Sequence, residues 1–120
     1  GNKFLKIFSG KNLTAITVFE NNIILGTSNG ILTLNGKSLK AGKIDQKLPW
    51  TEITSIENIK DQLWFGSTKG AFKLRKDGKY DYYASKRWLV DNEVVDMASG
   101  PDNSVLVLTK KGLSRINFDK

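Results

Sequence analysis

Three stretches of the chain share one pattern of apolar and polar positions. Each has a short apolar run, then small or polar residues, then a glycine that opens a second run. The stretches are IILGTSNGILTL (23–34), LWFGSTKGAFKL (63–74) and VLVLTKKGLSRI (105–116), in which Gly30, Gly70 and Gly112 recur at spacings of 40 and 42 residues. Repetition at such a period is typical of proteins built from one repeated structural unit.

The periodicity within each stretch predicts β-strands. The first run, for example residues 63–65, consists of β-branched, aromatic and aliphatic residues and predicts a buried central strand. The run after the glycine alternates, with Ala71 and Lys73 on one side of the pleat and Phe72 and Leu74 on the other. This second run therefore predicts a strand with one face that is more exposed to solvent.

Further repeated segments surround these two strands. A related strand precedes each stretch, at 13–19, 53–59 and 94–100, and the segments 37–50 and 79–92 have room for a fourth strand and a loop. Hairpin turns are expected at Asn21-Asn22, Lys60-Asp61, 100–103, Asn35-Gly36 and Asp77-Gly78. No segment of useful length has helical periodicity, so we expect essentially no helix.

Four short antiparallel strands every 40 residues or so match one blade of a β-propeller. We predict an all-β fold with three blades per chain, at about 13–50, 53–90 and 94–116, and an additional N-terminal strand at 3–8. The whole chain, 1–120, would form this single three-blade segment. The small residue after each apolar run and the later glycine would allow tight turns and close packing between blades.

The second copy resembles the repeat of the two-component-regulator propellers, the sensor β-propellers of hybrid two-component systems. The match runs through Leu63, Trp64, Phe65, Gly66, Ser67, Gly70, Phe72 and Leu74. The first copy has Ile24 in place of the tryptophan, and the third has Leu108 in place of the glycine. The resemblance implies a propeller and a periplasmic or extracellular sensor domain, but it does not identify a ligand, because one fold hosts many functions.

Composition narrows the possible partners. The chain has 120 residues, 39% of them hydrophobic, which is enough for a core, and 19 Lys and Arg against 12 Asp and Glu give a net charge of +7. This charge favours anionic partners, but no recognised nucleic-acid motif accompanies it, so nucleic acid is not expected. No apolar run approaches the roughly 18 residues of a membrane span, and Gly1 is interpreted as a processing or cloning remnant.

Most enzyme chemistry is disfavoured by what the sequence lacks. With no His and no Cys, the usual general base, metal ligands and thiol nucleophile are missing together. A carboxylate pair for glycoside hydrolysis stays conceivable among Glu52, Glu57, Asp91, Glu93 and Asp96, although solvated surface charges are the simpler interpretation. We therefore expect no catalytic residue, no metal site and no cofactor.

The candidate ligand site combines aromatic and basic residues. The loops before the first strands should meet the turns after the second strands at one edge of the propeller, where variable loops present ligand contacts. The segment YDYYASKRWL (80–89) either supplies stacking groups there or forms an outer strand whose aromatics cover the blade. The predicted ligand-binding residues are Trp50, Lys69, Arg87, Trp88, Lys110 and Lys111.

These residues favour a non-catalytic ligand-recognition module that binds an acidic glycan, such as an oligosaccharide of uronic acids, or another anion. The alternative is a structural or protein-interaction propeller that uses the same loops against a partner chain and has no small-molecule site.

Assembly is a separate expectation, because propellers close with about four to eight blades and three blades leave two open faces. A homodimer would close a six-bladed ring by pairing strand 3–8 of each chain beside strand 112–116 of the other. The competing explanation is a piece of a longer propeller.

Overall fold

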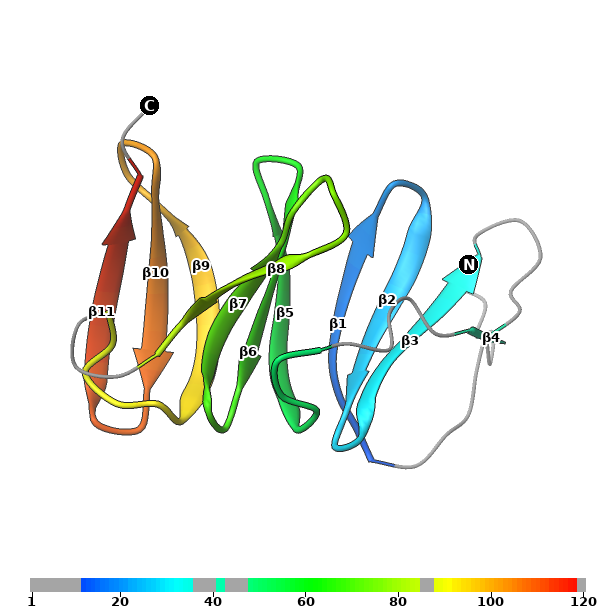
Figure 1. The fold of residues 1–120 in the computed structure, drawn as a ribbon, viewed down its shortest axis with the longest axis horizontal. Coiled ribbons are helices and arrows are strands. Elements are labelled where there is room, and N and C mark those ends of the chain that lie inside the picture. The colour runs from blue at the N-terminus through cyan, green and yellow to red at the C-terminus, as the bar shows by residue number, and fades with distance from the viewer. Residues whose placement is uncertain (1–11, 36–40, 43–47, 85–87, 119–120) are drawn as a thin grey trace, which may run out of the picture.

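The computed structural model describes residues 12–35, 41–42, 48–84 and 88–118, which form three antiparallel sheets side by side (Figure 1). No helix occurs in these residues, as the sequence predicts. The expected strand at 3–8 and the turn at Asn35-Gly36 lie wholly or partly outside the described residues. The described part of the chain is therefore a row of three propeller blades.

Each blade is a meander in which successive strands are neighbours. The first blade contains β1 (Leu13–Phe19), β2 (Asn22–Thr27), β3 (Gly30–Asn35) and the two-residue β4 (Ala41–Gly42). The second contains β5 (Ile53–Ile59), β6 (Gln62–Ser67), β7 (Gly70–Leu74) and β8 (Tyr80–Tyr83). The third contains β9 (Val94–Gly100), β10 (Ser104–Thr109) and β11 (Gly112–Asn117), without a fourth strand among the described residues.

The turns between the first and second strands each contain two successive residues with positive φ. Both residues of Glu20-Asn21, of Lys60-Asp61 and of Asp102-Asn103 have positive φ. In the first two blades these two residues are the whole loop, which is the type I′ hairpin turn, whose twist matches that of the flanking strands. In the third blade Pro101 precedes them in a three-residue loop. The first turn is one residue earlier than predicted, because Asn22 already pairs with Phe19 at the start of β2.

A hydroxyl group fixes each turn between the second and third strands. The Ser67 hydroxyl donates to the carbonyl of Gly70 (2.8 Å) and accepts from the amide of Lys69 (3.1 Å). Thr27 and Thr109 make the same pair of hydrogen bonds in the other blades. Gly70 has φ +120°, a conformation that side chains rarely adopt. The repeated hydroxyl-x-x-Gly pattern is thus explained by the geometry of this turn.

Glycines at the ends of the second strands let the blades approach closely. A Cβ on Gly26 would lie 2.6 Å from Cγ2 of Ile53 in the next blade, and a Cβ on Gly66 would lie 2.5 Å from Cγ1 of Val94. Beside them, the Thr54 hydroxyl donates to the carbonyl of Val94 (2.7 Å), as Thr14 does to that of Ile53 (2.6 Å). Each joint between blades is therefore a glycine that receives a β-branched side chain, supported by a hydroxyl hydrogen bond.

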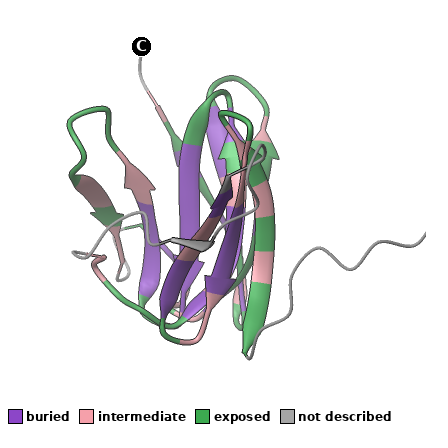
Figure 2. Ribbon diagram, turned by 90° about the vertical axis from the view of Figure 1, so that its right-hand side faces the viewer, coloured by how far each residue is buried: buried purple, intermediate pink, exposed green. Residues whose placement is uncertain are grey.

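The core lies between the blades, and the middle blade is covered on both faces. One apolar cluster joins the first two blades around Phe65 and Phe72, and the other joins the last two around Trp64. Figure 2 shows the buried residues gathered in the strands, and exposed residues at the turns and along strands at the rim such as β1. The predicted solvent-exposed face is present on β11, where exposed and buried residues alternate, but not on β7, since Ala71 and Phe72 are both fully buried. The physical reason is that blades pack on both sides of this sheet.

Candidate functional site

The turns gather at two opposite edges of the row of blades (Figure 1). One edge, called here the loop edge, carries the turns between the second and third strands, at 28–29, 68–69 and 110–111. It also carries segments 50–52 and 91–93, which precede β5 and β9. Hydrogen bonds join the two sets, from Thr68 N to Glu52 O (3.3 Å) and from Lys110 N to Glu93 O (3.2 Å). The opposite edge, the hairpin edge, carries turns 20–21, 60–61, 101–103 and 75–79.

Trp50 is held in place at the loop edge by a chain of hydrogen bonds. Its indole Nε1 donates to Oγ1 of Thr68 (3.0 Å), and that hydroxyl donates to Oε1 of Glu52 (2.9 Å). Nζ of Lys69 lies 5.8 Å from the centroid of the Trp50 ring, within the range of a cation–π contact. Trp50 is still 39% exposed. The second blade therefore presents an oriented indole face beside an ammonium group.

The outer strand β8 supports this cluster. The hydroxyl of Tyr82 donates to the backbone carbonyl of Lys69. Tyr80 contacts Phe65 and Phe72 in the core, with centroids 6.0 and 5.3 Å apart. The aromatic segment thus forms an outer strand that covers the blade, which is one of the two interpretations of the sequence. One of its tyrosines, Tyr82, also holds the turn at Lys69 in place.

The third blade has an ion pair at the corresponding place. Nζ of Lys110 lies 3.0 Å from Oε2 of Glu93. The hydrogen bond to Glu93 and the charge of that carboxylate raise the pKa of Lys110 above its ordinary value. Much of the charge of Lys110 is compensated within the protein, which makes it a poorer candidate for binding an anion than Lys69.

The structure does not bring all the predicted site residues into one group. Trp88 packs its ring edge-on against Tyr83, with centroids 5.1 Å apart, while the ring of Trp50 contacts Lys69. Lys111 lies at the loop edge through its turn, and its backbone amide donates to the hydroxyl of Thr109 (3.3 Å). Arg87 lies outside the described residues. Trp50 and Lys69 are the pair that the structure places together.

Two of the candidate carboxylates lie on neighbouring inner strands. Burial, and to a lesser degree the charge of Asp96, raise the pKa of Glu57 above its ordinary value. Asp96 accepts a hydrogen bond from the hydroxyl of Ser55 (3.3 Å) and one from the amide of Met97 (2.9 Å). In the described ranges no three acidic side chains come together in a group that could hold a metal ion.

Sequence reasoning missed the hollows at the hairpin edge. One of about 400 Å³ lies between the second and third blades, lined by Ile59, Lys60, Gln62, Lys73, Asn103, Ser104, Val105 and Phe118. Another of about 440 Å³ lies between the first two blades and includes Glu20, Asp61 and Arg75. Such hollows depend on which side chains neighbouring blades bring together, and no local motif records that.

No family model matches the chain, and no curated protein is significantly similar to it. Solved structures do share its fold. The extracellular domain of the putative hybrid two component system BT4673 from B. thetaiotaomicron matches 92% of this chain with a TM-score of 0.77 and 23% identity. That of BT3049 from the same organism matches 98% with a TM-score of 0.68 and 14% identity. Virginiamycin B lyase from Staphylococcus aureus matches 91% with a TM-score of 0.59 and 16% identity.

The chain spans only part of each of these proteins: 16% of the BT4673 chain, 20% of the BT3049 chain and 42% of the lyase chain. The similarity to a lyase shows that the fold also occurs in an enzyme, so fold alone does not decide activity. Within the described residues no helix is long and apolar enough to cross a membrane. By fold, the chain is a partial propeller similar to extracellular domains of hybrid two-component systems.

Proposed function

We propose that the chain is a non-catalytic ligand-recognition segment of a periplasmic or extracellular sensor propeller, of the two-component-regulator type, and that it binds an acidic glycan or another anion at the loop edge. The observation that carries the proposal is the ammonium of Lys69 beside the exposed, hydrogen-bonded indole of Trp50. The similarity to extracellular sensor-system domains supports the location and the role.

The chemistry of the pair suits a uronic-acid sugar. An indole face packs against the apolar C–H face of a sugar ring, and an ammonium group attracts its carboxylate. Because Thr68 and Glu52 already hold the indole in one orientation, little side-chain entropy is lost when a sugar binds. No covalent step is involved, which agrees with a chain that has no His or Cys.

Thermal shift and calorimetric titration with oligogalacturonate, with neutral oligosaccharides for comparison, test this proposal. We expect binding of the acidic oligomer, weakened about tenfold by Trp50→Ala or Lys69→Met, because each removes a direct contact. Lys110→Met is the matched control and should weaken binding less, because Glu93 already pairs with Lys110. A lack of binding by any uronate, or equal effects of all three variants, would count against a loop-edge site.

A second candidate is a structural or protein-interaction propeller. The observation that favours it is the exposed apolar surface on the two end faces of the row. Ile16 on the first blade is 65% exposed, although its counterpart Ile56 is buried in a joint, and Leu113 on the third blade is 59% exposed. Co-purification of a protein partner without any response to acidic sugars would favour this candidate.

We further propose that a second copy of the chain covers these end faces and closes a six-bladed ring as a homodimer. The third blade and the first blade of the partner would meet at two equivalent joints. One residue makes this joint different from the internal ones: Leu108 stands where Gly26 and Gly66 receive the next blade. The closing joint must therefore be wider than the internal joints, or its partner strand must be shifted.

A further inference from the structure

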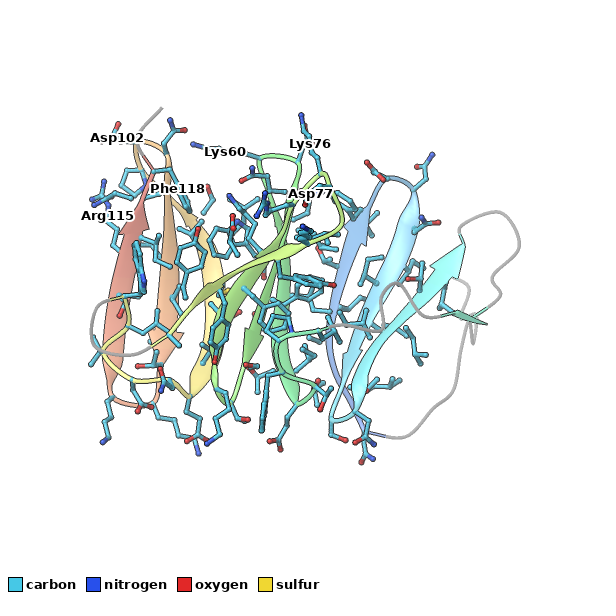
Figure 3. The ribbon with its side chains drawn as sticks, viewed as in Figure 1. Lys60, Lys76, Asp77, Asp102, Arg115 and Phe118 are labelled. Atoms are coloured by element: carbon cyan, nitrogen blue, oxygen red, sulfur yellow. The ribbon has the colours of Figure 1, made fainter. Side chains whose placement is uncertain are left out.

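The hollow between the second and third blades at the hairpin edge has the features of a small binding site. Its volume of about 400 Å³ lies within the range of small-molecule pockets. Two elements supply its walls, namely the turn at Lys60 and the segment from Asn103 to Val105, which begins 43 residues later, and Phe118 adds an aromatic wall. Figure 3 shows Lys60 and Phe118 at this edge of the blades.

A sheltered lysine lies in this hollow. The side chain of Lys73 is only 15% exposed, and its Nζ lies 5.2 Å from the ring centroid of Phe118 and 5.9 Å from that of Trp64. Its carboxylate neighbour is Asp81, at 3.7 Å, and Arg75 shares the same carboxylate at 3.7 Å. The ammonium is therefore flanked by two aromatic rings and by a carboxylate that it shares with Arg75.

A second ammonium and neutral polar groups complete the walls. Nζ of Lys60 donates to Oδ1 of Asn103 (3.0 Å), and the backbone of Asn103 accepts a hydrogen bond from the amide of Phe118 (2.9 Å). Gln62 and Ser104 add neutral hydrogen-bonding groups. The lining contains two lysines and no carboxylate, whereas Glu20 and Asp61 line the neighbouring hollow between the first two blades.

We propose that this hollow binds a small organic carboxylate of about monosaccharide size, such as a uronate. The carboxylate pairs with the ammonium groups of Lys73 and Lys60, and an apolar face of the ligand packs against Phe118. The site lies at the opposite edge from Trp50 and Lys69, so it does not rest on the function proposed for the loop edge. The two sites are distinguished by their variants.

The experiment is a titration of the protein with D-glucuronate, followed by the amide signals in ¹H–¹⁵N NMR spectra, with D-glucose as the neutral comparison. Glucuronate should shift the amide signals of Asn103 and Phe118, and glucose should leave them in place. Lys73→Met keeps the apolar stem and should weaken binding by about tenfold or more, the loss expected for a charge-assisted hydrogen bond. Lys79→Met, at an exposed lysine of the same edge outside both hollows, should change affinity by less than about twofold.

A further variant separates binding from folding. Lys60 occupies a turn position with φ +52°, where Asn is preferred. Lys60→Asn should therefore raise the melting temperature while it weakens glucuronate binding several-fold. Unshifted amides at Asn103 and Phe118 would overturn the proposal. The proposal would also be overturned if Lys73→Met and Lys79→Met lowered the affinity for glucuronate equally, or if Trp50→Ala lowered it instead.

Discussion

Glu57 shows how one side chain can make stability depend on pH. It lies on the inner strand β5, where burial and then the charge of Asp96 on the adjacent β9 raise its pKa above 4.5. A carboxyl group with a raised pKa in the folded state binds its proton more tightly than in the unfolded chain. Its ionisation therefore opposes folding. The free energy of unfolding should fall as the pH rises from the pKa of Glu57 in the unfolded chain through its higher pKa in the folded protein.

The prediction at the residue scale follows from this sign. Glu57→Gln removes the ionisation and should make the protein more stable at pH 7, by a few tenths of a kcal/mol to about 1 kcal/mol because the group is only partly buried. At pH 3, where Glu57 is protonated, the difference should shrink. Urea unfolding at the two pH values measures it. A stability gain that is equal at both would show that the charge of Glu57 is not the cause.

At the scale of the strands, the close approach of neighbouring blades depends on glycine. Gly66 at the end of β6 receives the side chain of Val94 from β9, and the backbone of β9 accepts the hydrogen bond of Thr54 beside it. Trp64, two residues earlier on the same face, is fully buried between these blades. Close approach at the glycine therefore lets the large aromatic residue make its contacts with both blades.

Gly66→Val should accordingly destabilise the protein. Its Cβ would lie 2.5 Å from Val94 Cγ1, so the blades must separate, at a cost of about 1–3 kcal/mol or more. Gly78→Asn is the matched control, because no atom lies within 4 Å of a Cβ there and Asn tolerates its positive φ, so it should cost only a few tenths of a kcal/mol. Urea unfolding compares the two. Similar decreases in the free energy of unfolding for both variants would mean that close approach at Gly66 is not what stabilises the packing of the blades.

The sequence predicted the strands well because their signals are local. Apolar runs and turn residues lie within short segments, and β2, β6 and β10 follow them closely. The recurrence of Gly30, Gly70 and Gly112 shows that these local signals repeat along the chain. The burial of Ala71 and the hollow around Lys73 were missed, because both arise where one blade packs against another. Trp50 and Lys69 were predicted to share an edge because turns alternate between edges in a meander.

At the scale of the whole molecule, the two end faces carry apolar positions that the joints bury elsewhere. The third blade exposes Leu108 (44%) and Leu113, and beside them a shallow hollow of about 200 Å³ includes Asp96, Met97 and Leu106. The first blade exposes Ile16 on its outer face. Apolar surfaces at matching positions of a repeat favour covering by another blade, as occurs at the two internal joints.

Light scattering tests whether a second copy supplies that blade. We expect a dimer, twice the 13.4 kDa of one chain, at micromolar concentration. Leu108→Gly should tighten the dimer, because a glycine there restores the geometry in which Gly26 and Gly66 receive the next blade. The residue received would be Leu13 of the partner, the counterpart of Ile53 and Val94.

In the Leu108→Gly background, Leu13→Ala should then remove most of the gain in dimer affinity. In the wild-type background the same substitution should weaken the dimer less. The difference between the two effects is the coupling energy of a double-mutant cycle. The reason is that Leu13 can enter the joint only when position 108 is small. A wild-type chain that stays monomeric at micromolar concentration would contradict ring closure by a second copy. A dimer that Leu108→Gly dissociates would instead show that Leu108 contributes apolar contact to a joint unlike the internal ones.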